Sequence, residues 1–448
     1  MSTMFMIDYS VNKNFWKLFS WKKAQNNLFC LQKRLFRSVQ VGDIRNSLKI
    51  QRLILSSNST RLLSIRKMTQ LSSKRKISGI DGKIFLTFSE RFELNEYVRL
   101  NCFSWTPQRI KKIPISSRNG QLYLLSILTI SDCVWQCLVF FALDPAHEST
   151  FHFSNIGFRS FYSVYDAQRL FYLKLNVSAF GSQKRILLVD LEKCFPLRNS
   201  SLLMSRLLAP KEIKTGIFSS LNVNVFEGFF NDSQCNFSLL SSLLTNIIIN
   251  GIENLHSLIR FGSKIFVFLK PFHSEVLISD SFIQYLDQYF CFKSELLSFR
   301  VISTEEGFDF EGWTFRLSSQ GIFTCVPSYS KYKMFRFTVK QIINNSNYSS
   351  KTKAIKLSPI IYNWRNYHRF CNVSVSRNIL FSLQKKAFKV FNREVKQNRF
   401  STKRLLDQAF PFVNFVDNFS IHFSYMSCKH IFYYKGIFFC LYCGRLTL

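Results

Sequence analysis

Positive charge is concentrated in two separate segments of this 448-residue chain. Asn12–Lys83 carries 17 Lys or Arg against two acidic residues, and Lys331–Arg404 carries 18 against one. The two segments hold 32 of the 33 net positive charges, so the rest of the chain is close to neutral. A surplus of this size indicates a polyanionic partner. We therefore expect two basic arms on either side of a neutral middle.

The first basic arm has the periodicity of amphipathic helices. Lys22–Val39 repeats apolar residues at helical spacing, and Asp43 is placed to cap a second helix over Ile44–Ser56. A basic loop, Ser72–Lys76, then leads to a turn at Gly79–Gly82. A solvated face would explain one isolated charged helix, but 17 cations against two anions favour a binding surface. The apolar stripe consists of Ala24, Leu28, Leu31 and Leu35.

The neutral middle, Ile84–Ser330, mixes strand-like and helix-like runs. Arg185–Asp190 is a short apolar run that ends in a carboxylate, as a buried strand does when it delivers an acid to a sheet edge. Lys264–Leu269 is a second apolar strand, and Phe308–Arg316 alternates apolar and polar residues. These patterns predict an α+β fold. The run Val134–Leu143 is shorter than the roughly 18 residues that span a bilayer. We therefore expect a buried helix or strand there, and no membrane partner.

The second basic arm is also helical. We expect Pro359 to open a helix that bears Trp364–Arg369. Aromatic and basic side chains interleave within Leu357–Arg369, which suits RNA, because cations neutralise phosphates and flat rings stack on unpaired bases. Packing in a helical core is the alternative interpretation for Trp364 and Tyr367. A later apolar stripe consists of Leu380, Leu383, Ala387 and Phe391.

Four residues near the end of the sequence have zinc-ligand chemistry: Cys428, His430, Cys440 and Cys443. The separation between His430 and Cys440 is unusual, and large apolar residues surround the cysteines. We interpret the cysteines as buried thiols and predict no metal and no other cofactor, with zinc binding by all four residues as the alternative. The 12 Cys have no framework spacing and no secretory signal opens the chain, which indicates a reducing compartment.

Several short motifs stand in an order that points to one family. The longest is Asp144–Ala167, with Glu148, Gly157, Phe158 and Arg159 in place. Together the motifs resemble group II intron-encoded proteins, the reverse transcriptase–maturases. The shorter matches are Leu31–Arg34, Gly79–Gly82, Asp190–Phe195, Ser241–Ile247, Glu305–Gly312 and Leu357–Arg369.

This resemblance implies reverse transcriptase-like fingers and palm, followed by an all-α thumb or maturase domain. We expect an N-terminal basic helical extension at residues 1–83 and degenerate fingers and palm at residues 84–330. A basic helical thumb should follow at residues 331–404. Residues 405–448 form a C-terminal tail that the pattern does not assign.

The catalytic part of the family pattern is missing. The family has Tyr-Ala-Asp-Asp on a tight hairpin, and Phe261–Lys264 stands in its place, so that Ser263 and Lys264 replace both acids. Polymerisation needs those acids, together with the motif A carboxylate, to hold two Mg²⁺ ions. Asp190 remains as a remnant, for which we expect a structural role. We therefore predict no catalytic residues and no polymerase activity. Further departures are Pro196 at the second acidic position of motif A, and Asn236 and Phe237 at the nucleotide site.

The resemblance implies a maturase that binds group II-type intron RNA in precursor mRNA and assists its splicing without being an enzyme. An active RNA-dependent DNA polymerase of an intron is the first alternative, and a general organellar RNA-binding protein is the second. Additional splicing proteins are candidate partners. The expected RNA-binding residues are Lys33, Arg34, Arg37, Lys74, Arg75, Lys76, Arg365, Tyr367, Arg369, Lys385, Lys386, Lys389 and Arg393.

The composition also bears on the compartment. Enrichment in Phe, Asn, Ile and Lys favours an A+T-rich genome, such as that of an organelle. The motif matches begin near Trp16, which leaves no room for a long transit peptide. We therefore expect an organelle-encoded plastid protein, similar to the reduced maturases of euglenoid plastids.

Overall fold

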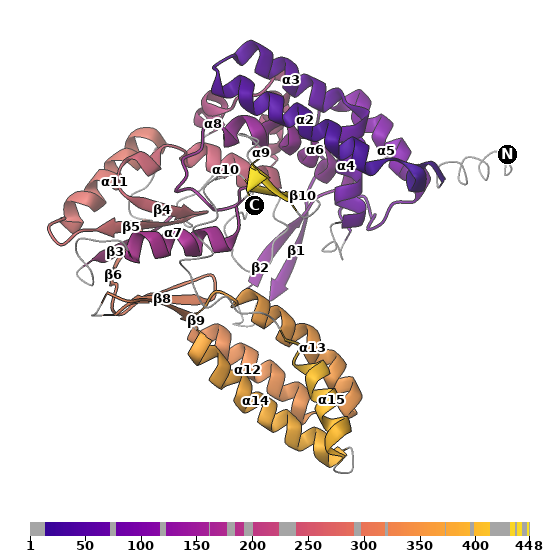
Figure 1. The fold of residues 1–448 in the computed structure, drawn as a ribbon. Helices are drawn as coiled ribbons and strands as arrows, with labels where there is room; N and C mark the ends of the chain where they lie inside the picture. Colours follow the sequence, from indigo (N-terminus) through magenta and orange to yellow (C-terminus); the bar gives the residue numbers. More distant parts are fainter. Residues whose placement is uncertain are drawn as a thin grey trace.

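The computed structural model describes residues 14–71, 78–116, 122–160, 162–176, 184–191, 200–223, 239–290, 297–318, 321–371, 373–394 and 398–412, and three short strands between residues 431 and 447. Helices and sheets are mixed, which confirms the α+β prediction. Figure 1 shows the N-terminal helices at the top, a central sheet with flanking helices, and a helical bundle at the lower end.

The N-terminal helices surround one buried helix. The predicted stripe is confirmed, because Ala24, Leu28 and Leu35 are buried and Leu31 is partly buried against the same core. Asp43 caps its helix as predicted, since its Oδ1 accepts a hydrogen bond from Asn46 N at 3.0 Å. The elements are α2 (Trp21–Gln40), α3 (Ile44–Ser56), α4 (Asn58–Arg66), a π-helical turn (Lys67–Leu71), α5 (Phe88–Asn101) and the buried α6 (Ile130–Glu148).

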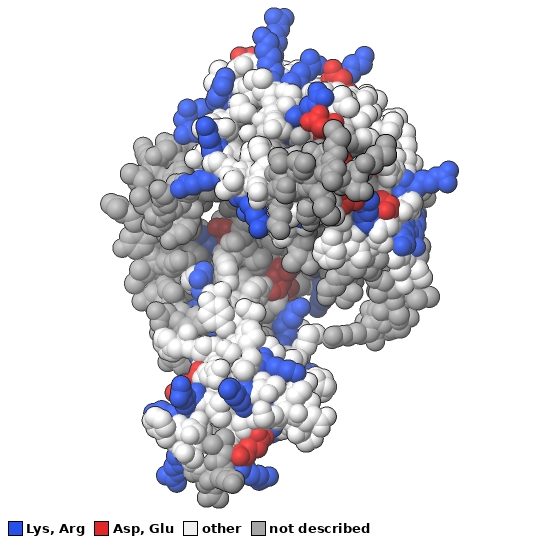
Figure 2. Space-filling view, turned by 90° about the vertical axis from the view of Figure 1, so that its right-hand side faces the viewer, with Lys and Arg blue, Asp and Glu red and all other residues white. Residues whose placement is uncertain are grey.

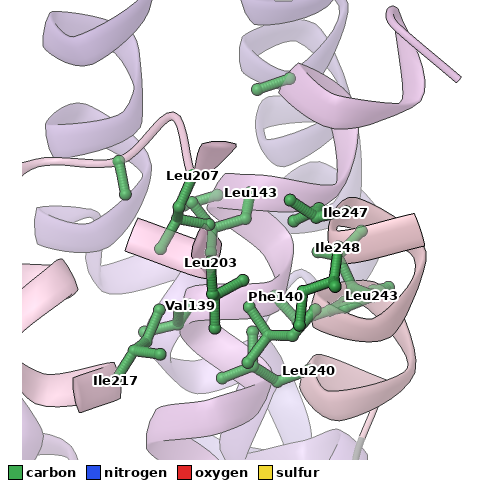
Figure 3. Close-up of a cluster of buried hydrophobic side chains, with 14 of the residues drawn as sticks. Val139, Phe140, Leu143, Leu203, Leu207, Ile217, Leu240, Leu243, Ile247 and Ile248 are labelled. Atoms are coloured by element: carbon green, nitrogen blue, oxygen red, sulfur yellow. The ribbon is translucent and has the colours of Figure 1, made fainter. Parts of the chain in front are cut away.

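The apolar run Val134–Leu143 forms the middle of α6, which confirms the prediction of a core element. Figure 3 shows three α6 side chains, Val139, Phe140 and Leu143, packed against residues of three further helices. Those helices are α8 (Ser200–Arg206), α9 (Lys211–Asn222) and α10 (Leu239–Ile249). Among the described helices, none combines the length and apolar character needed to cross a membrane. The same core contains Leu35 and Leu286, so it includes residues from both sides of the domain boundary predicted after residue 83. That boundary stays a prediction.

A four-stranded antiparallel sheet divides two hydrophobic cores. Along β5, Ile265, Val267 and Leu269 enter the core of α6, while Phe266 and Phe268 enter a second core. The period of two residues along a strand produces this division. The strand order is β4-β5-β3-β6, with β4 (Leu258–Phe261), β5 (Lys264–Leu269), β3 (Arg185–Asp190) and β6 (Ser298–Ser303). Both predicted strands, β3 and β5, are confirmed.

The second core lies between this sheet, α7 (Val164–Asn176) and a small sheet. Phe171 of α7 contacts Phe266 and Phe315 edge-on or tilted, with ring centroids 5.0 and 5.2 Å away. The alternating run Phe308–Arg316 is a hairpin of two strands, because Glu311 and Gly312 have positive φ and turn the chain. The small sheet comprises β7 (Phe308–Phe310), β8 (Trp313–Leu317) and β9 (Phe323–Pro327).

The C-terminal bundle has its own core, in which the predicted stripe of Leu380, Leu383, Ala387 and Phe391 is buried. The prediction that Pro359 opens a helix is wrong. The helix begins at Ser350, where Ser349 accepts a hydrogen bond from Thr352 N, and it ends at Tyr367. Pro359 removes one hydrogen bond from the helix interior, and burial of Leu357 and Ile361 on either side holds the helix through it. The helices are α12 (Tyr329–Asn344), α13 (Ser350–Tyr367), α14 (Val373–Glu394) and α15 (Arg399–Ala409).

The remaining elements complete the fold around these cores. A hairpin projects from the upper layer toward the bundle in Figure 1, and a long helix, α11 (Glu275–Phe290), flanks the central sheet. The tail that the sequence left unassigned contains three short strands. The hairpin is β1 (Lys111–Ser116) and β2 (Leu122–Ile127), and the tail strands are β10 (Ile431–Tyr434), β11 (Ile437–Cys440) and β12 (Leu446–Thr447).

Leu357→Ala should lower the free energy of unfolding by about 2–5 kcal/mol, because it opens a cavity in the bundle core. Leu357 is fully buried, whereas Ile355, two residues earlier on α13, is 54% exposed. Ile355→Ala is the matched control and should change the free energy by less than about 0.5 kcal/mol. Urea denaturation followed by circular dichroism measures both, and equal effects would contradict the packing of α13.

Candidate nucleic-acid interface and the adjoining sheet corner

One corner of the central sheet brings together Asp190, Ser263 and Lys264. Asp190 ends β3 and is paired in register with Lys264, the first residue of β5. Gly262 and Ser263 form the two-residue turn between β4 and β5, and Gly262 supplies its positive φ of 62°. Leu191 N donates a hydrogen bond to the Ser263 carbonyl oxygen at 3.0 Å, which joins the end of β3 to this turn. The tight hairpin expected at Phe261–Lys264 is therefore confirmed.

The described residues of this corner carry one acid and one cation. A hydroxyl and a cation stand on the turn, and one carboxylate stands across from them on β3. Opposite charges paired across strands attract each other, whereas two Mg²⁺ ions require several carboxylates at close range. Within the part of the chain that the structure describes, no three His, Cys, Asp or Glu side chains are grouped to hold a metal.

Some predicted residues cannot be placed. The departures at Pro196, Asn236 and Phe237 lie outside the described residues, as do Cys428, His430 and Cys443. The backbone of Cys440 lies in β11, but its side chain is outside the description. The prediction of no zinc site therefore stays a prediction.

The loop that follows α6 is fixed directly against the hairpin. Ile156 N donates to the Arg260 carbonyl oxygen, and Arg260 N donates to that of Ser154, each at 2.9 Å. Gly157 approaches the turn so closely that a Cβ there would lie 2.1 Å from Gly262 N. Only glycine at position 157 permits this close approach. The loop and the hairpin therefore form one unit.

Two buried ion pairs hold this unit in place. The Arg159 guanidinium bonds the Glu148 carboxylate at 2.5 Å and also donates to the carbonyl oxygens of His152 and Asn155. Burial alone would lower the pKa of Arg159, but the Glu148 carboxylate beside it raises that pKa, so the guanidinium stays charged. Glu148, Gly157 and Arg159 of the motif Asp144–Ala167 thus have structural roles.

The second ion pair was not predicted. Arg260 Nε donates to Glu253 at 2.6 Å, and its Nη1 donates to Asn246 Oδ1 at 3.0 Å. Asn246 Nδ2 in turn donates to the Gly157 carbonyl oxygen at 2.9 Å. The sequence contained one signal of this network, an arginine inside the otherwise apolar strand Leu258–Phe261. A buried charge of this kind requires a partner.

The predicted cationic residues lie on helices at opposite ends of the molecule. Arg34 and Arg37 are exposed on α2, and Lys33 is partly buried there. On α14, Lys385, Lys389 and Arg393 are exposed and Lys386 is partly buried. Figure 2 shows Lys and Arg projecting from both the upper helices and the lower bundle, with a hollow between them. The basic loop with Lys74, Arg75 and Lys76 lies outside the described residues.

The aromatic residues of Leu357–Arg369 are used in packing. Trp364 stacks on Phe335, with ring centroids 4.1 Å apart and an interplanar angle of 14°, which confirms its interpretation as a core aromatic. Tyr367 stacks on Trp313 of β8 at 4.8 Å, and its hydroxyl donates to the Glu311 carbonyl oxygen. Trp313 Nε1 donates to Nδ1 of His368, whose pKa is lowered by burial to about 3, so this ring is a neutral acceptor. These interactions join the bundle to the small sheet.

The two arginines of this segment that were predicted to bind RNA, Arg365 and Arg369, also contact other parts of the chain. Arg365 Nη1 donates to the Pro411 carbonyl oxygen at 2.6 Å, and burial lowers the pKa of its guanidinium. Arg369 lies over the Phe370 ring at 4.5 Å and the Tyr165 ring at 5.2 Å. RNA binding by Arg365, Tyr367 and Arg369 stays a prediction.

Comparison with known proteins decides the family. Residues 16–98 match the N-terminal domain of reverse transcriptase. The chain is 41% identical to "Maturase-like protein 1" of Euglena gracilis, over 98% of this chain and 99% of that protein. It belongs to the group II intron maturase-type proteins. "Maturase-like protein 1" of Euglena longa is 37% identical over 99% of the chain and 100% of its own length. "Protein YkfC" of Escherichia coli (strain K12) is 29% identical over 46% of the chain and 57% of its length.

The ion pair that holds the loop should be essential for stability. Arg159→Met is expected to lower the free energy of unfolding by about 3–5 kcal/mol, because it leaves the Glu148 carboxylate buried without its partner. Arg99→Met breaks the exposed pair with Glu96 on α5 and should cost less than about 1 kcal/mol. Thermal unfolding monitored by calorimetry compares the two variants. Equal losses of unfolding free energy in the two variants would contradict a larger stabilising contribution from the buried pair.

Proposed function

We propose that this maturase-type protein binds a group II-type intron RNA and assists its splicing without polymerase activity. The observation that carries the proposal is the sheet corner, where Lys264 is in register with Asp190 and Ser263 occupies the turn. The tight turn at Gly262 and Ser263 supports the alignment of Phe261–Lys264 with the family's hairpin. A cation at this position repels Mg²⁺, whereas the basic surfaces remain available for phosphates.

We further propose that the arrangement of helices and sheets corresponds to the fingers, palm and thumb of a reverse transcriptase. The four-stranded sheet with α7 and α11 corresponds to a palm, and the helices before it, with β1 and β2, correspond to an N-terminal extension and fingers. The bundle α12–α15 corresponds to a thumb. We propose the divisions 1–83, 84–330, 331–404 and 405–448 for these parts. Basic residues at both ends would then contact the intron on either side of the central sheet (Figure 1).

In this mechanism the RNA performs the transesterifications, and the protein stabilises the active RNA conformation. Such a shift requires the protein to bind the native RNA fold more tightly than its alternatives. Phosphate contacts supply sequence-independent affinity, and the fixed separation of the two basic surfaces supplies selectivity for shape. The residues that we propose for RNA binding are those of α2, α14 and the loop 74–76 predicted from the sequence, with Arg365, Tyr367 and Arg369.

We place this activity in a plastid. The composition indicates an A+T-rich coding genome, and the two relatives that align over the whole chain come from Euglena species. Further splicing proteins are proposed partners, because one protein with two basic surfaces covers only part of a large folded RNA.

Primer extension on poly(rA)/oligo(dT) with Mg²⁺ tests the absence of polymerase activity. We expect no nucleotide incorporation by the wild-type protein, because Ser263 and Lys264 replace the two hairpin acids that the family uses to hold the metals. The Asp190→Ala variant is the control, because it shows whether any incorporation that is detected depends on this site. Incorporation by the wild type that Asp190→Ala abolishes would favour an active polymerase instead.

Neutralising Lys385, Lys386 and Lys389 together with Gln should weaken binding to a structured intron RNA and reduce its salt dependence. The slope of log K against log salt should fall by roughly 0.7–0.9 for each phosphate that the protein no longer neutralises. A matched variant, Arg99→Gln/Lys211→Gln/Arg300→Gln, removes three charges outside both basic segments and should have little effect. Filter binding over a salt series measures both, and equal slopes for the two variants would exclude α14 from the interface.

A further inference from the structure

Helix α12 carries aromatic side chains on two opposite faces. Phe335 is 7% exposed and stacks on Trp364 in the bundle core. Phe337 is 61% exposed. It lies two residues after Phe335, which turns its side chain by about 200° around the helix axis, away from the bundle core. A fully packed phenylalanine is stabilised by burial, whereas Phe337 leaves most of its ring in water. The ring of Phe337 is therefore accessible to a partner outside this chain.

Two lysines are spaced to lie next to this exposed ring on the helix surface. Lys333 lies four residues before Phe337, Arg336 is adjacent and Lys340 lies three residues after it, so Lys333 and Lys340 are its neighbours along the helix surface. Met334, 52% exposed, adds apolar surface beside the ring. The nine residues from 333 to 341 contain no acid. We name Lys333, Met334, Arg336, Phe337 and Lys340 the α12 aromatic face.

We propose that the α12 aromatic face binds an unpaired segment of RNA, with one base stacked on Phe337 and neighbouring phosphates on Lys333, Arg336 and Lys340. This inference rests on the proposed function and names the kind of RNA that one surface recognises. A single strand offers both a π-face and a chain of phosphates, which are the two features that this surface complements. In a duplex the base faces are covered by their neighbours, so duplex RNA gains only the phosphate interactions.

A protein partner fits this face less well. Its apolar centre is small, and docking a protein on it would remove three cations from water, at a cost that requires three matched acids. A phosphate backbone supplies those negative charges without leaving water completely. The location differs from the one that the sequence suggested, because the ring of Trp364 is occupied by Phe335, whereas the ring of Phe337 is open.

Fluorescence anisotropy with a short oligouridine, and with an RNA duplex of the same length, tests the proposal on the full-length protein. Phe337→Ala should weaken oligouridine binding by roughly 5- to 100-fold and leave the duplex affinity nearly unchanged. Phe337→Trp should retain the affinity, and Phe337→Leu should lose it, since leucine keeps apolar area but has no ring to stack. The salt slope should stay the same in all three variants, because no charge is removed.

The control is Phe272→Ala, which removes a 68% exposed ring outside both basic segments and should change neither affinity. Photocrosslinking of 5-iodouridine RNA should label the peptide that contains Phe337, and this label should disappear in Phe337→Leu. If Phe337→Leu binds oligouridine like the wild type, or if duplex binding falls equally, stacking on this face is wrong. If the wild-type protein binds no RNA in a salt-dependent way, the proposed function itself is wrong.

Discussion

The close approach of Gly157 to Gly262 is the constraint on which the central part of this protein depends. Two backbones meet there with no room for a Cβ atom, and the surrounding carbonyl groups are satisfied by Arg159, Asn246 and the loop hydrogen bonds. The ion pairs Arg159–Glu148 and Arg260–Glu253 are both fully buried. Charges in such a place are tolerated only when each has its partner. The geometry of the hairpin therefore depends both on its own Arg260 and on the loop from Ser154 to Arg159, which lies far before it in the sequence.

This arrangement explains how the fold tolerates Ser263 and Lys264 at the hairpin turn. Asp190, Ser263 and Lys264 are all partly exposed at the corner, whereas the residues that fix the hairpin are buried behind it. Substitutions at the corner change charge and metal affinity without opening a cavity or leaving a buried charge unpaired. In our proposal the family's scaffold has been kept for holding two RNA-binding surfaces apart, and the chemistry has been left to the RNA.

The joint between the small sheet and the bundle uses the residues that first suggested RNA binding. Trp313, Tyr367 and His368 stack or hydrogen-bond with one another, and Tyr165 donates to the Asn366 carbonyl oxygen at 3.2 Å. A basic-aromatic segment thus combines two uses. Its rings position the bundle, and its cations lie among the residues proposed for RNA binding.

The sequence by itself determined the charge segregation, the helical stripes on α2 and α14, the strands β3 and β5, and the family. These features follow from the spacing of apolar residues along the sequence and from the order of the motifs, and both can be read from the sequence alone. Only the tertiary structure decided which aromatic rings are covered. Trp364 and Phe337 both lie in a basic segment, but Phe335 covers the first, and nothing in the described part of the chain covers most of the second. It also revealed the pairing of Arg260 with Glu253 and the helical position of Pro359. These features depend on which helices and strands pack against each other. Contacts between distant elements produce no periodic pattern in the sequence.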